Sequence, residues 1–344
     1  MESNAPSSEI VRVTDLVEVY ADGTRAIDGI SFHVKEGEFF GFLGPNGAGK
    51  STTIKVLTTL LRKTSGTVSI AGLDLDKDPQ KIRKLIGVQS QETSLDPELT
   101  GRENMILQGN LQQMRGPELE ARVDHLLEVV GLKDAANKRA ARYSGGMKKR
   151  LDLGSTLVHK PTVLFLDEPT TGLDPQSRAT VWEYLQNLNK KEGITIFLTT
   201  QYLEEADRLC SRLCIVDQGK IVAEGTPSDL KKEIGADAIT ISVQDQNGQS
   251  TETTRAEARK ILATLPTVVN IADSGDGLTV YAKDGGQFVP ELVRAFDKSS
   301  IKLISINLSS PTLDDVFLKH TGKRIRVEEA EKQAPAGMFG RRGR

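Results

Sequence analysis

The stretch GPNGAGKST, residues 44–52, most strongly limits what this chain can fold into. It matches the pattern G-x-x-x-x-G-K-[ST], whose glycines let backbone N–H groups converge on phosphate oxygens. EFFGFL (38–43) before it has strand character, and TIKVLTTLL (53–61) after it has helical spacing. A strand, a glycine-rich loop and a helix in this order begin a parallel α/β unit. The motif therefore predicts an α/β fold built around a phosphate-binding loop.

Every residue of this loop is expected to lie against the phosphates of a nucleotide. The helix that follows points its positive end at the same place. Lys50 is expected to reach the β- and γ-phosphates, and the Ser51 hydroxyl is expected to ligate Mg²⁺. The loop residues are Gly44, Pro45, Asn46, Gly47, Ala48, Gly49, Lys50, Ser51 and Thr52.

VLFLDEP, residues 163–169, supplies the partner of the loop. Its four apolar residues read as a buried strand that delivers Asp167 to the carboxyl end, where Mg²⁺ would sit. Glu168 follows directly and is placed to orient or deprotonate an attacking water. ITIFLTT (194–200) is a second continuous apolar run, as expected for a strand covered on both faces.

YSGGMKKR, residues 143–150, is the deciding motif. Ser-Gly-Gly at the start of a helix exposes N–H groups and a hydroxyl to an anion, although alone it could equally be a helix cap. Beside the phosphate-binding loop, it resembles the LSGGQ-like signature of ATP-binding cassette (ABC) ATPases, with Tyr143 in the usual leucine place. The resemblance implies that Ser144, Gly145 and Gly146 bind ATP.

Further segments resemble other motifs of the same family. VYADGTRAIDGISF resembles the adenine-stacking segment, which implies that Tyr20 is the aromatic platform. IGVQSQE resembles the Q-loop, and the register counted from its Ile-Gly pair favours Gln91 over Gln89 as the residue that senses Mg²⁺ and faces the transport partner. TTGLDP resembles the D-loop, which implies that Asp174 lies at a dimer contact.

Gln201 stands where the wider family carries a histidine that hydrogen-bonds the γ-phosphate. Its amide can donate a hydrogen bond but cannot carry positive charge. The resemblance therefore implies a slower ATPase in which Glu168, Gln201 and Lys50 are the catalytic residues. The alternative is that Gln201 caps the following helix or faces solvent.

Three segments narrow the resemblance: FLTTQYLEEAD, YSGGMKKRLDLG and SPTLDDVFLKHTG. They look like the ATP-binding subunits of daunorubicin/doxorubicin-type antibiotic exporters, which also carry Gln at the switch position. In that group the nucleotide-binding chain is separate from its membrane partner. The resemblance implies export of a hydrophobic drug-like or other amphiphilic substrate. It also implies a cytoplasmic chain held on the inner face of the membrane by a transmembrane permease subunit.

The same resemblance implies how the copies assemble. Two copies would pair head-to-tail, so that the phosphate-binding loop of one and the signature of the other close on one ATP. The permease would contact a groove near Gln91 and residues 92–104. The rival is a soluble ABC ATPase of translation or DNA repair, which more often has two cassettes, a coiled-coil insertion or a zinc insertion. A P-loop GTPase is disfavoured because NKRA (137–140) lacks the aspartate that reads guanine.

The pattern of elements changes along the chain. GRENMILQGNLQQM and PELEARVDHLLEVVGL read as helices of a separate lobe. After residue 235 the apolar runs spell β-α-β-β-α-β, the ferredoxin-like order. We expect a disordered N-terminus, an ABC ATPase domain with a helical lobe, a small α+β domain and a flexible tail, at residues 1–9, 10–235 (lobe about 95–155), 236–321 and 322–344. Weak contact with a membrane surface is the alternative reading of the basic tail.

Composition excludes several other classes. The net charge of −2 does not favour nucleic acid as a partner. The apolar runs are far shorter than the roughly 20 residues that span a bilayer, and the polar N-terminus is not a secretory signal. Cys210 and Cys214 are interpreted as small buried thiols of a reducing compartment. A metal site is disfavoured, because their surroundings lack further metal ligands.

Overall fold

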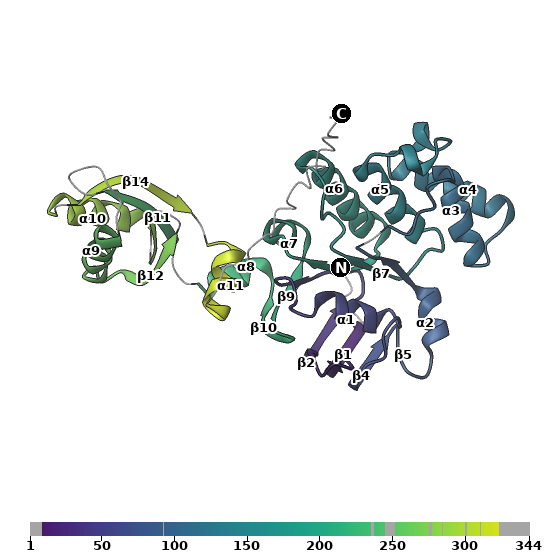
Figure 1. Cartoon of the computed structure of the whole chain (residues 1–344), viewed down its shortest axis with the longest axis horizontal. Helices are drawn as coiled ribbons and strands as arrows, with labels where there is room; N and C mark the ends of the chain where they lie inside the picture. Colours follow the sequence, from purple (N-terminus) through teal and green to yellow (C-terminus); the bar gives the residue numbers. More distant parts are fainter. Residues whose placement is uncertain are drawn as a thin grey trace, which may run out of the picture. The chain divides into compact units, whose positions relative to one another are not determined.

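The computed structural model of the protein describes residues 9–91, 93–234, 237–244, 252–274, 277–283, 285–299, 301–309 and 311–322 (Figure 1). By packing, the chain divides into two compact units. The first comprises the described residues up to Glu205 together with Val216–Lys220, and the second comprises Ala206–Ile215 and the described residues from Ile221 onward. Our expectations for residues 1–8 and for the tail after Gly322 lie outside the described residues.

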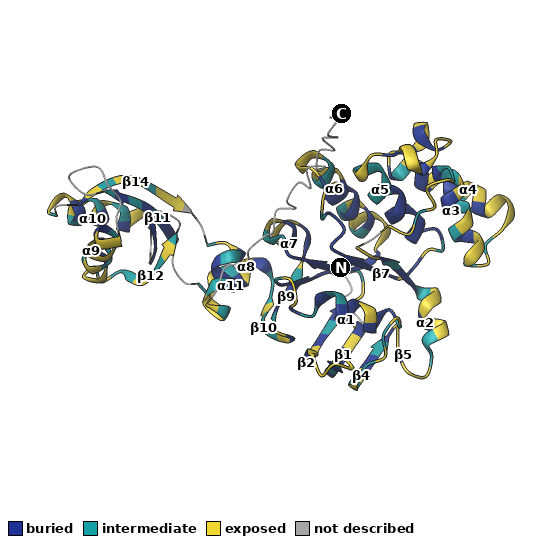
Figure 2. Cartoon of the chain, viewed as in Figure 1, coloured by how far each residue is buried: buried dark blue, intermediate teal, exposed yellow. Residues whose placement is uncertain are grey.

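The central sheet has six strands in the order β10-β9-β3-β8-β7-β6. Its β3-β8, β8-β7 and β7-β6 pairs are parallel. Every residue of β3, β7 and β8 is buried (Figure 2), which confirms that these continuous apolar runs are strands covered on both faces. The strands are β3 (Phe39–Leu43), β6 (Ile86–Gln89), β7 (Val163–Asp167), β8 (Thr195–Thr200), β9 (Arg212–Asp217) and β10 (Lys220–Gly225).

A second sheet of the first unit, in the order β2-β1-β4-β5, is antiparallel. This sheet was not expected from the sequence as a separate layer. Phe32 of β2 joins it to the core, because its ring lies 5.7 Å from that of Phe40 and 5.8 Å from that of Phe197. Its strands are β1 (Glu9–Val19), β2 (Arg25–Lys35), β4 (Ser65–Ile70) and β5 (Leu73–Asp74).

The helical lobe consists of α3 (Gly101–Leu111), α4 (Gly116–Val129) and α5 (Gly145–Thr156), with short 3₁₀ turns at Lys133–Ala135 and Ala140–Arg142. These helices match the two helical segments and the signature helix that we predicted. The remaining helices up to residue 232 are α1 (Lys50–Leu57), α2 (Pro79–Leu85), α6 (Pro175–Glu192), α7 (Leu203–Leu209) and α8 (Pro227–Lys232). None of the helices in the described part of the chain has the length and apolar character needed to cross a bilayer.

The helix after the phosphate-binding loop is shorter than predicted. We expected it to run to residue 61, whereas α1 ends at Leu57. Thr59 adopts a left-handed conformation with φ of 63°. The amides of Leu60 and Leu61 then turn back to the carbonyl of Lys55, at 2.8 and 3.0 Å. This closing turn satisfies carbonyl groups at the helix end and stops the helix.

The second unit contains a ferredoxin-like domain, as predicted. Its elements follow the order β11-α9-β12-β13-α10-β14, and its antiparallel sheet has the order β12-β13-β11-β14. The buried core lies between this sheet and the two helices and includes Ile239, Val280, Phe288 and Leu292. The bounds are β11 (Asp237–Gln244), α9 (Glu252–Ala263), β12 (Val268–Ser274), β13 (Gly277–Ala282), α10 (Gly285–Asp297) and β14 (Lys302–Ser309), followed by α11 (Leu313–Thr321).

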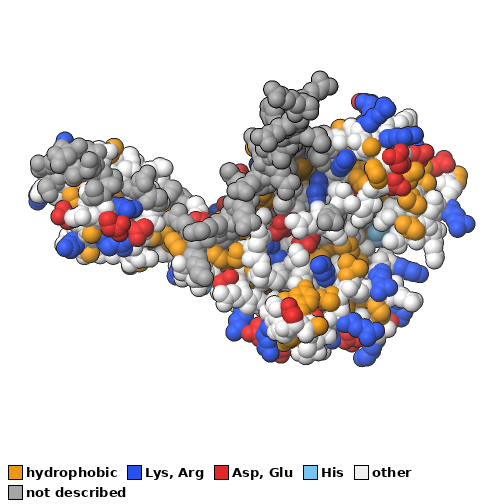
Figure 3. Space-filling model, in the orientation of Figure 1, with side chains coloured by type: hydrophobic (Ala, Val, Ile, Leu, Met, Phe, Trp, Pro, Cys, Tyr) orange, Lys and Arg blue, Asp and Glu red, His pale blue; other side chains and the backbone are white. Residues whose placement is uncertain are grey.

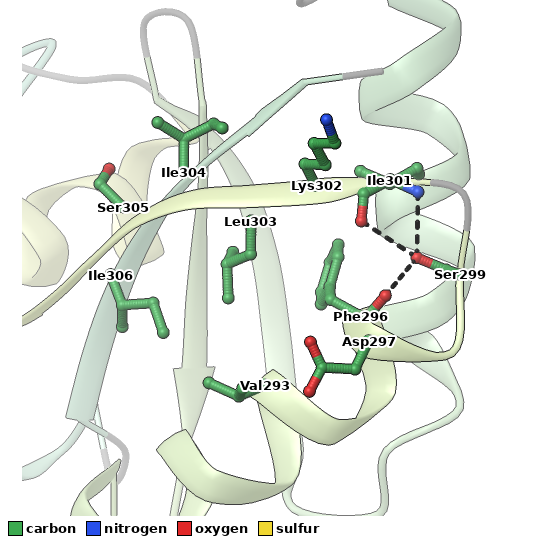
Figure 4. Close-up of a pocket in the computed structure, with 10 residues that line it drawn as sticks. All are labelled: Val293, Phe296, Asp297, Ser299, Ile301, Lys302, Leu303, Ile304, Ser305 and Ile306. Carbon is green, nitrogen blue, oxygen red and sulfur yellow. Dashed lines mark hydrogen bonds between the residues drawn. The ribbon is translucent and has the colours of Figure 1, made fainter. Parts of the chain in front are cut away.

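A groove of about 520 Å³ lies between α10 and the edge strand β14 (Figure 4). Leu303 and Ile306 of β14 point toward Val293 of α10, whereas Ile304 points to the opposite side of the strand. The turn between the two elements is closed by Ser299, whose hydroxyl lies 2.8 Å from the carbonyl of Phe296. Val293, Phe296 and the Asp297 carboxylate line the helix side of this groove.

Both cysteines lie in the second unit and are buried thiols. Cys210 follows α7 and Cys214 lies on β9, so a change of element separates them. This confirms the prediction of two small buried thiols.

Candidate active site

The strand register brings the predicted motifs to one edge of the central sheet. On β8, Thr200 pairs with Leu43 of β3, and Thr199 pairs with Asp167 of β7. The phosphate-binding loop, Glu168 and Gln201 each begin directly after one of these three parallel strands. They therefore share the carboxyl edge of the sheet, where open α/β sheets bind their ligands.

Glycine is required at two positions of the phosphate-binding loop. A Cβ at Gly44 would lie 2.3 Å from the carbonyl oxygen of Val216. Gly49 has φ of 100°, and a Cβ there would lie 2.4 Å from the carbonyl oxygen of Ala26. Gly49 also precedes α1 without any side-chain cap, so the first amides of that helix are left for an anion. The loop therefore has the cradle that phosphates need.

Lys50 lies inside this loop and is only 4% exposed. Its Nζ donates to the carbonyls of Gly44 at 2.8 Å and Pro45 at 3.0 Å. It also pairs with Oε1 of Glu168 at 3.2 Å. The two charged residues predicted from separate motifs are thus in direct contact.

Asp167 contacts the phosphate-binding loop through Ser51. The Ser51 hydroxyl donates to Asp167 Oδ1 at 3.1 Å, and the Thr199 hydroxyl donates to the same oxygen at 2.6 Å. The carboxylate is 6% exposed. A hydroxyl and a carboxylate oxygen side by side are the kind of ligand Mg²⁺ takes together with phosphate oxygens. Among the described residues no group of three or more His, Cys, Asp or Glu side chains could hold a metal ion.

Glu168 occupies a strained turn immediately after β7. Its φ is 49°, which is uncommon for a residue with a side chain and recurs at functional sites. The backbone N–H donates to the carbonyl of Thr199 at 3.1 Å, and Oε2 accepts from the Thr171 hydroxyl at 3.1 Å. These contacts fix the carboxylate, while Lys50 holds its other oxygen.

Gln201 is buried at the corner between β8 and α7, with 5% exposure. The side chain therefore does not face solvent, which was one of the two alternatives expected from the sequence. Its amide oxygen Oε1 accepts no hydrogen bond from any described residue, so it does not cap α7. A buried amide oxygen without a partner is costly unless a ligand or water supplies a donor.

Tyr20 precedes the phosphate-binding loop in the chain, and Gln91 follows it. The Tyr20 hydroxyl lies 2.9 Å from the Thr52 hydroxyl of α1, and 37% of the residue is exposed, which leaves ring surface for stacking. Gln91 is exposed, whereas Gln89 is 1% exposed and its amide donates to the carbonyl of Lys149 at 3.3 Å. The solvent-accessible glutamine is thus the one that the register favoured.

The signature residues form the exposed start of α5. Ser144 is the N-cap and accepts from the N–H of Met147 at 3.2 Å. A Cβ on Gly145 would meet open space, whereas one on Gly146 would lie 2.8 Å from Ser177 Oγ. Among the described residues, the signature and the phosphate-binding loop of one chain are not joined by a hydrogen bond.

Asp174 is the N-cap of α6 and accepts from the N–H of Ser177 at 2.9 Å. Hydrogen bonds from Ser177 lower the pKa of this carboxyl below its usual value. The D-loop and the signature thus approach each other through Ser177, which contacts Asp174 and limits the space at Gly146.

Sequence reasoning missed three supporting residues. The Thr199 hydroxyl donates to Asp167, and the Thr171 hydroxyl donates to Glu168. The polar end of the apolar run ITIFLTT is the signal that could have identified Thr199. Glu205 is 0% exposed and accepts from Thr170 and from the indole of Trp182, both at 2.8 Å. Burial raises the pKa of Glu205, and these hydrogen bonds oppose that shift.

The fold and the site define a class: a P-loop ATPase built as an ATP-binding cassette. The family model described as "ABC transporter" matches residues 27–171. The family model described as "ATP-binding protein DrrA1-3-like, C-terminal domain" matches residues 225–321. A daunorubicin resistance ATP-binding protein of Streptomyces coeruleorubidus is 41% identical over 90% of this chain and 94% of its own length. A daunorubicin/doxorubicin resistance ATP-binding protein of Streptomyces peucetius is 39% identical over 97% of this chain and all of its own. A Nod factor export ATP-binding protein of Burkholderia thailandensis is 41% identical over 90% of this chain and 96% of its own.

Solved structures of ATP-binding cassettes are also similar to this chain. The ATP-binding cassette MJ0796, in a dimeric post-hydrolysis state with ADP and Pi, has a TM-score of 0.58 and 28% identity, covering 63% of this chain and 98% of that one. CbiO1 of Clostridium perfringens has a TM-score of 0.60 and 29% identity, covering 75% of this chain and 96% of that one. The chain belongs to the family of ABC transporter ATP-binding proteins, in the group of the daunorubicin/doxorubicin resistance ATP-binding proteins. It is an ATP-binding subunit that hydrolyses ATP.

Proposed function

We propose that this chain powers the efflux of a hydrophobic drug-like or other amphiphilic substrate through a separate permease subunit. The observation that carries its catalytic part is the contact of Lys50, Ser51, Asp167 and Glu168 at one sheet edge. Relatives named for daunorubicin resistance, linearmycin resistance and Nod factor export support the transport part. The test is ATP-dependent accumulation of doxorubicin by inside-out vesicles that hold this chain and a candidate permease subunit. Vesicles with the Glu168→Gln chain should accumulate none, and equal uptake by both would contradict the proposal.

Hydrolysis would begin with an exchange of partners at Lys50. In the structure, its ammonium is shared by two loop carbonyls and Glu168. The β- and γ-phosphates carry more negative charge than one carboxylate, so Lys50 would turn to them and release Glu168 Oε1. The freed carboxylate, still held by Thr171, would accept the proton of the attacking water.

Ser51, Asp167 and Gln91 would hold Mg²⁺ beside the phosphates. When bound, this ion neutralises charge on the phosphate oxygens. Ser51 and Asp167 are already joined by a hydrogen bond at 3.1 Å, so these two ligand groups lie side by side. Tyr20 would stack on the adenine, since its exposed ring stands next to α1. Purified protein should lose its turnover in a chelator and regain it with Mg²⁺.

Gln201 would act on the γ-phosphate and the attacking water together. Its amide N–H would donate to the phosphate, and the unpartnered Oε1 would accept from the water. A neutral donor in place of a charge-assisted one costs on the order of 1 kcal/mol, nearly tenfold in rate. This geometry fits a working but slower ATPase.

Gln201→Ala should lower kcat with ATP affinity changed by no more than about threefold, because a bond made mainly in the transition state acts on kcat. Gln201→His should keep or raise kcat by up to about tenfold. That gain should shrink as pH rises above about 6.5, where an unshifted imidazole loses its charge. Steady-state phosphate release from pH 6 to 8.5 measures both. An unchanged kcat in Gln201→Ala would remove Gln201 from the mechanism.

A head-to-tail homodimer would complete each site. Ser144 and Gly145 are exposed and have no hydrogen bond to their own phosphate-binding loop among the described residues, which supports a role toward a second copy. The dimeric cassette structures among the similar proteins support the same arrangement. The permease would contact the groove near Gln91 and residues up to 104, which would hold the chain at the inner face of the membrane.

Ser144→Arg should block closure of the dimer and leave ATP binding by the monomer nearly unchanged. A bulky cation would stand where the γ-phosphate of the other copy docks, while its own loop is untouched. The measurement is mass by light scattering in the Glu168→Gln background with Mg²⁺ and ATP, because slow turnover traps the closed state. Arg142→Ser, an exposed change two residues away, serves as the control. Equal dimer content with and without Ser144→Arg would contradict the shared site.

A further inference from the structure

The buried carboxylate of Glu205 joins three segments that surround the site. Glu205 lies on α7, four residues after Gln201, and is fully buried. Its Oε1 accepts hydrogen bonds from the Thr170 hydroxyl and from the Trp182 indole N–H, both at 2.8 Å. Thr170 lies two residues after Glu168, and Trp182 lies on α6. One oxygen therefore connects the turn that carries Glu168, the helix α6 and the helix that follows Gln201.

The turn that Thr170 belongs to holds Glu168 in its left-handed conformation, with φ of 49°. The N–H of Thr171 donates to the carbonyl of Glu168 at 3.2 Å, and the Thr171 hydroxyl donates to Glu168 Oε2 at 3.1 Å. A residue with a side chain keeps such a conformation only where its surroundings enforce it. The hydrogen bond from Thr170 to Glu205 anchors this turn to α7 and so helps to enforce it.

A second contact joins α6 to the corner that carries Gln201. Cζ of Arg178 lies 4.3 Å from the centre of the ring of Tyr202, the residue directly after Gln201. Arg178 and Trp182 are four residues apart and therefore lie on one face of α6. Through these two side chains, α6 contacts Tyr202 before the start of α7 and Glu205 within it. The corner is thus held at two points.

The stability of the fold does not explain a carboxyl group at this place. Burial raises the pKa of Glu205, and the hydrogen bonds from Thr170 and Trp182 oppose that shift. Its second oxygen, Oε2, has no hydrogen-bond partner among the described residues. A buried polar atom without a partner costs free energy, and an apolar side chain of similar size is often as stable as a buried charge. The carboxyl is therefore better explained by the groups that its Oε1 holds in place.

We propose that Glu205 is a positioning residue for ATP hydrolysis, which fixes Glu168 relative to Gln201. This inference rests on the proposed function, in which Glu168 accepts the proton of the attacking water and Gln201 contacts the γ-phosphate. Misplacing a catalytic group by about 1 Å can cost roughly 10²-fold in rate. The printed partners of Glu205 lie outside the phosphate-binding loop, so its loss should act on kcat and leave ATP affinity nearly unchanged.

The first experiment measures phosphate release by full-length variants over a range of ATP concentrations. Glu205→Met keeps an unbranched stem and removes the acceptor, so kcat should fall about 10- to 100-fold with KM within about threefold of wild type. Glu205→Gln keeps an oxygen that can accept from both donors, and its kcat should stay within about fivefold of wild type. Glu204→Met is the matched control, because it changes the preceding, exposed glutamate of the same helix and should leave kcat and KM unchanged.

A double-mutant cycle separates positioning from a general loss of stability. Thr170→Val removes the hydroxyl that donates to Glu205 and should also lower kcat, whereas Thr170→Ser keeps a hydroxyl and should preserve it. If the two residues act through one hydrogen bond, the double variant Thr170→Val with Glu205→Met should be no slower than Glu205→Met alone. Two independent losses would instead multiply.

The fluorescence of Trp182, the single tryptophan of the chain, reports whether each variant breaks the intended contact. Glu205→Met removes the acceptor of the indole N–H and should shift the emission to shorter wavelength. Thr170→Val leaves that acceptor in place and should not shift it. A loss of kcat in both variants with a shift in only one would assign the effect on rate to the bond with Thr170.

The outcomes distinguish this inference from the function it rests on. Wild-type kcat in folded Glu205→Met and Thr170→Val proteins would overturn the positioning role and leave the proposed function standing. Losses that multiply in the double variant would overturn it as well. Wild-type turnover in Glu168→Gln would instead contradict the proposed function, whatever the Glu205 variants show. If circular dichroism shows Glu205→Met to be unfolded, the comparison of Thr170→Val with Thr170→Ser carries the same test.

Discussion

The Glu168→Gln protein is expected to bind ATP like wild type and to hydrolyse it at least a hundredfold more slowly. General-base catalysis contributes roughly 10²–10⁴-fold, and an amide cannot take the proton of water. The substitution preserves size, and an amide oxygen can still accept the hydrogen bond that Thr171 gives to Glu168. It removes the charge that pairs with Lys50, so the phosphate cradle keeps its lysine for the nucleotide.

Two measurements check this prediction: phosphate release at saturating ATP, and the affinity for a fluorescent ATP analogue. Glu183→Gln is the control, because Glu183 is an exposed residue of α6 and its substitution makes the same chemical change. Glu183→Gln should keep wild-type turnover. Wild-type turnover in Glu168→Gln would show that another group accepts the proton.

Lys50→Ala is expected to weaken ATP binding itself by about 10- to 100-fold. A hydrogen bond to a charged group contributes roughly 1.5–3 kcal/mol, and each 1.4 kcal/mol is tenfold in affinity. Lys50 is the ammonium that the loop buries beside two carbonyls and Glu168, so its loss removes the cation placed to meet the phosphates there. Titration calorimetry with ATP measures the loss.

Folding needs its own control in this experiment, since removal of Lys50 leaves Glu168 buried without its cation. Lys50→Met keeps most of the stem volume and should lose ATP affinity to a similar extent. Lys55→Ala changes an exposed lysine of the same helix and should bind ATP normally. ATP affinity within twofold of wild type in a folded Lys50→Ala protein would exclude Lys50 from the phosphate site.

The site was predictable from sequence where backbone chemistry restricts the residue type. Gly44 and Gly49 are dictated by carbonyls that lie 2.3 and 2.4 Å from any added Cβ, and such positions leave a visible pattern. Asp167 was predictable because an apolar strand must end where the ligand begins. The ferredoxin-like order of the second unit was likewise predictable, since its strands and helices alternate in short, well-punctuated runs.

Contacts between distant residues left no such pattern. The ion pair of Lys50 with Glu168 joins residues from different motifs, and its existence follows only from the parallel register of β3, β8 and β7. The antiparallel sheet around β1 depends on pairing with β4, more than forty residues further along the chain. The helix after the loop ends early, at Leu57, because Thr59 adopts a left-handed conformation. The spacing of apolar residues does not predict that conformation.

Gln201 shows both sides of this division. The sequence identified it as an uncharged residue at a corner where a charged one was expected, but it left open whether the side chain faced solvent. Burial to 5% exposure and an amide oxygen without a partner remove that alternative. What the amide binds is decided by the kinetics of Gln201→Ala and Gln201→His.

The central claim is that one chain holds two half-sites and that hydrolysis needs two chains. The most direct test is the turnover per chain of wild-type protein over a dilution series, with the mass of each sample measured by light scattering at saturating Mg²⁺ and ATP. If hydrolysis needs two chains, turnover per chain should fall on dilution in step with the fraction of dimer. A constant turnover per chain in samples that contain only monomer would contradict it.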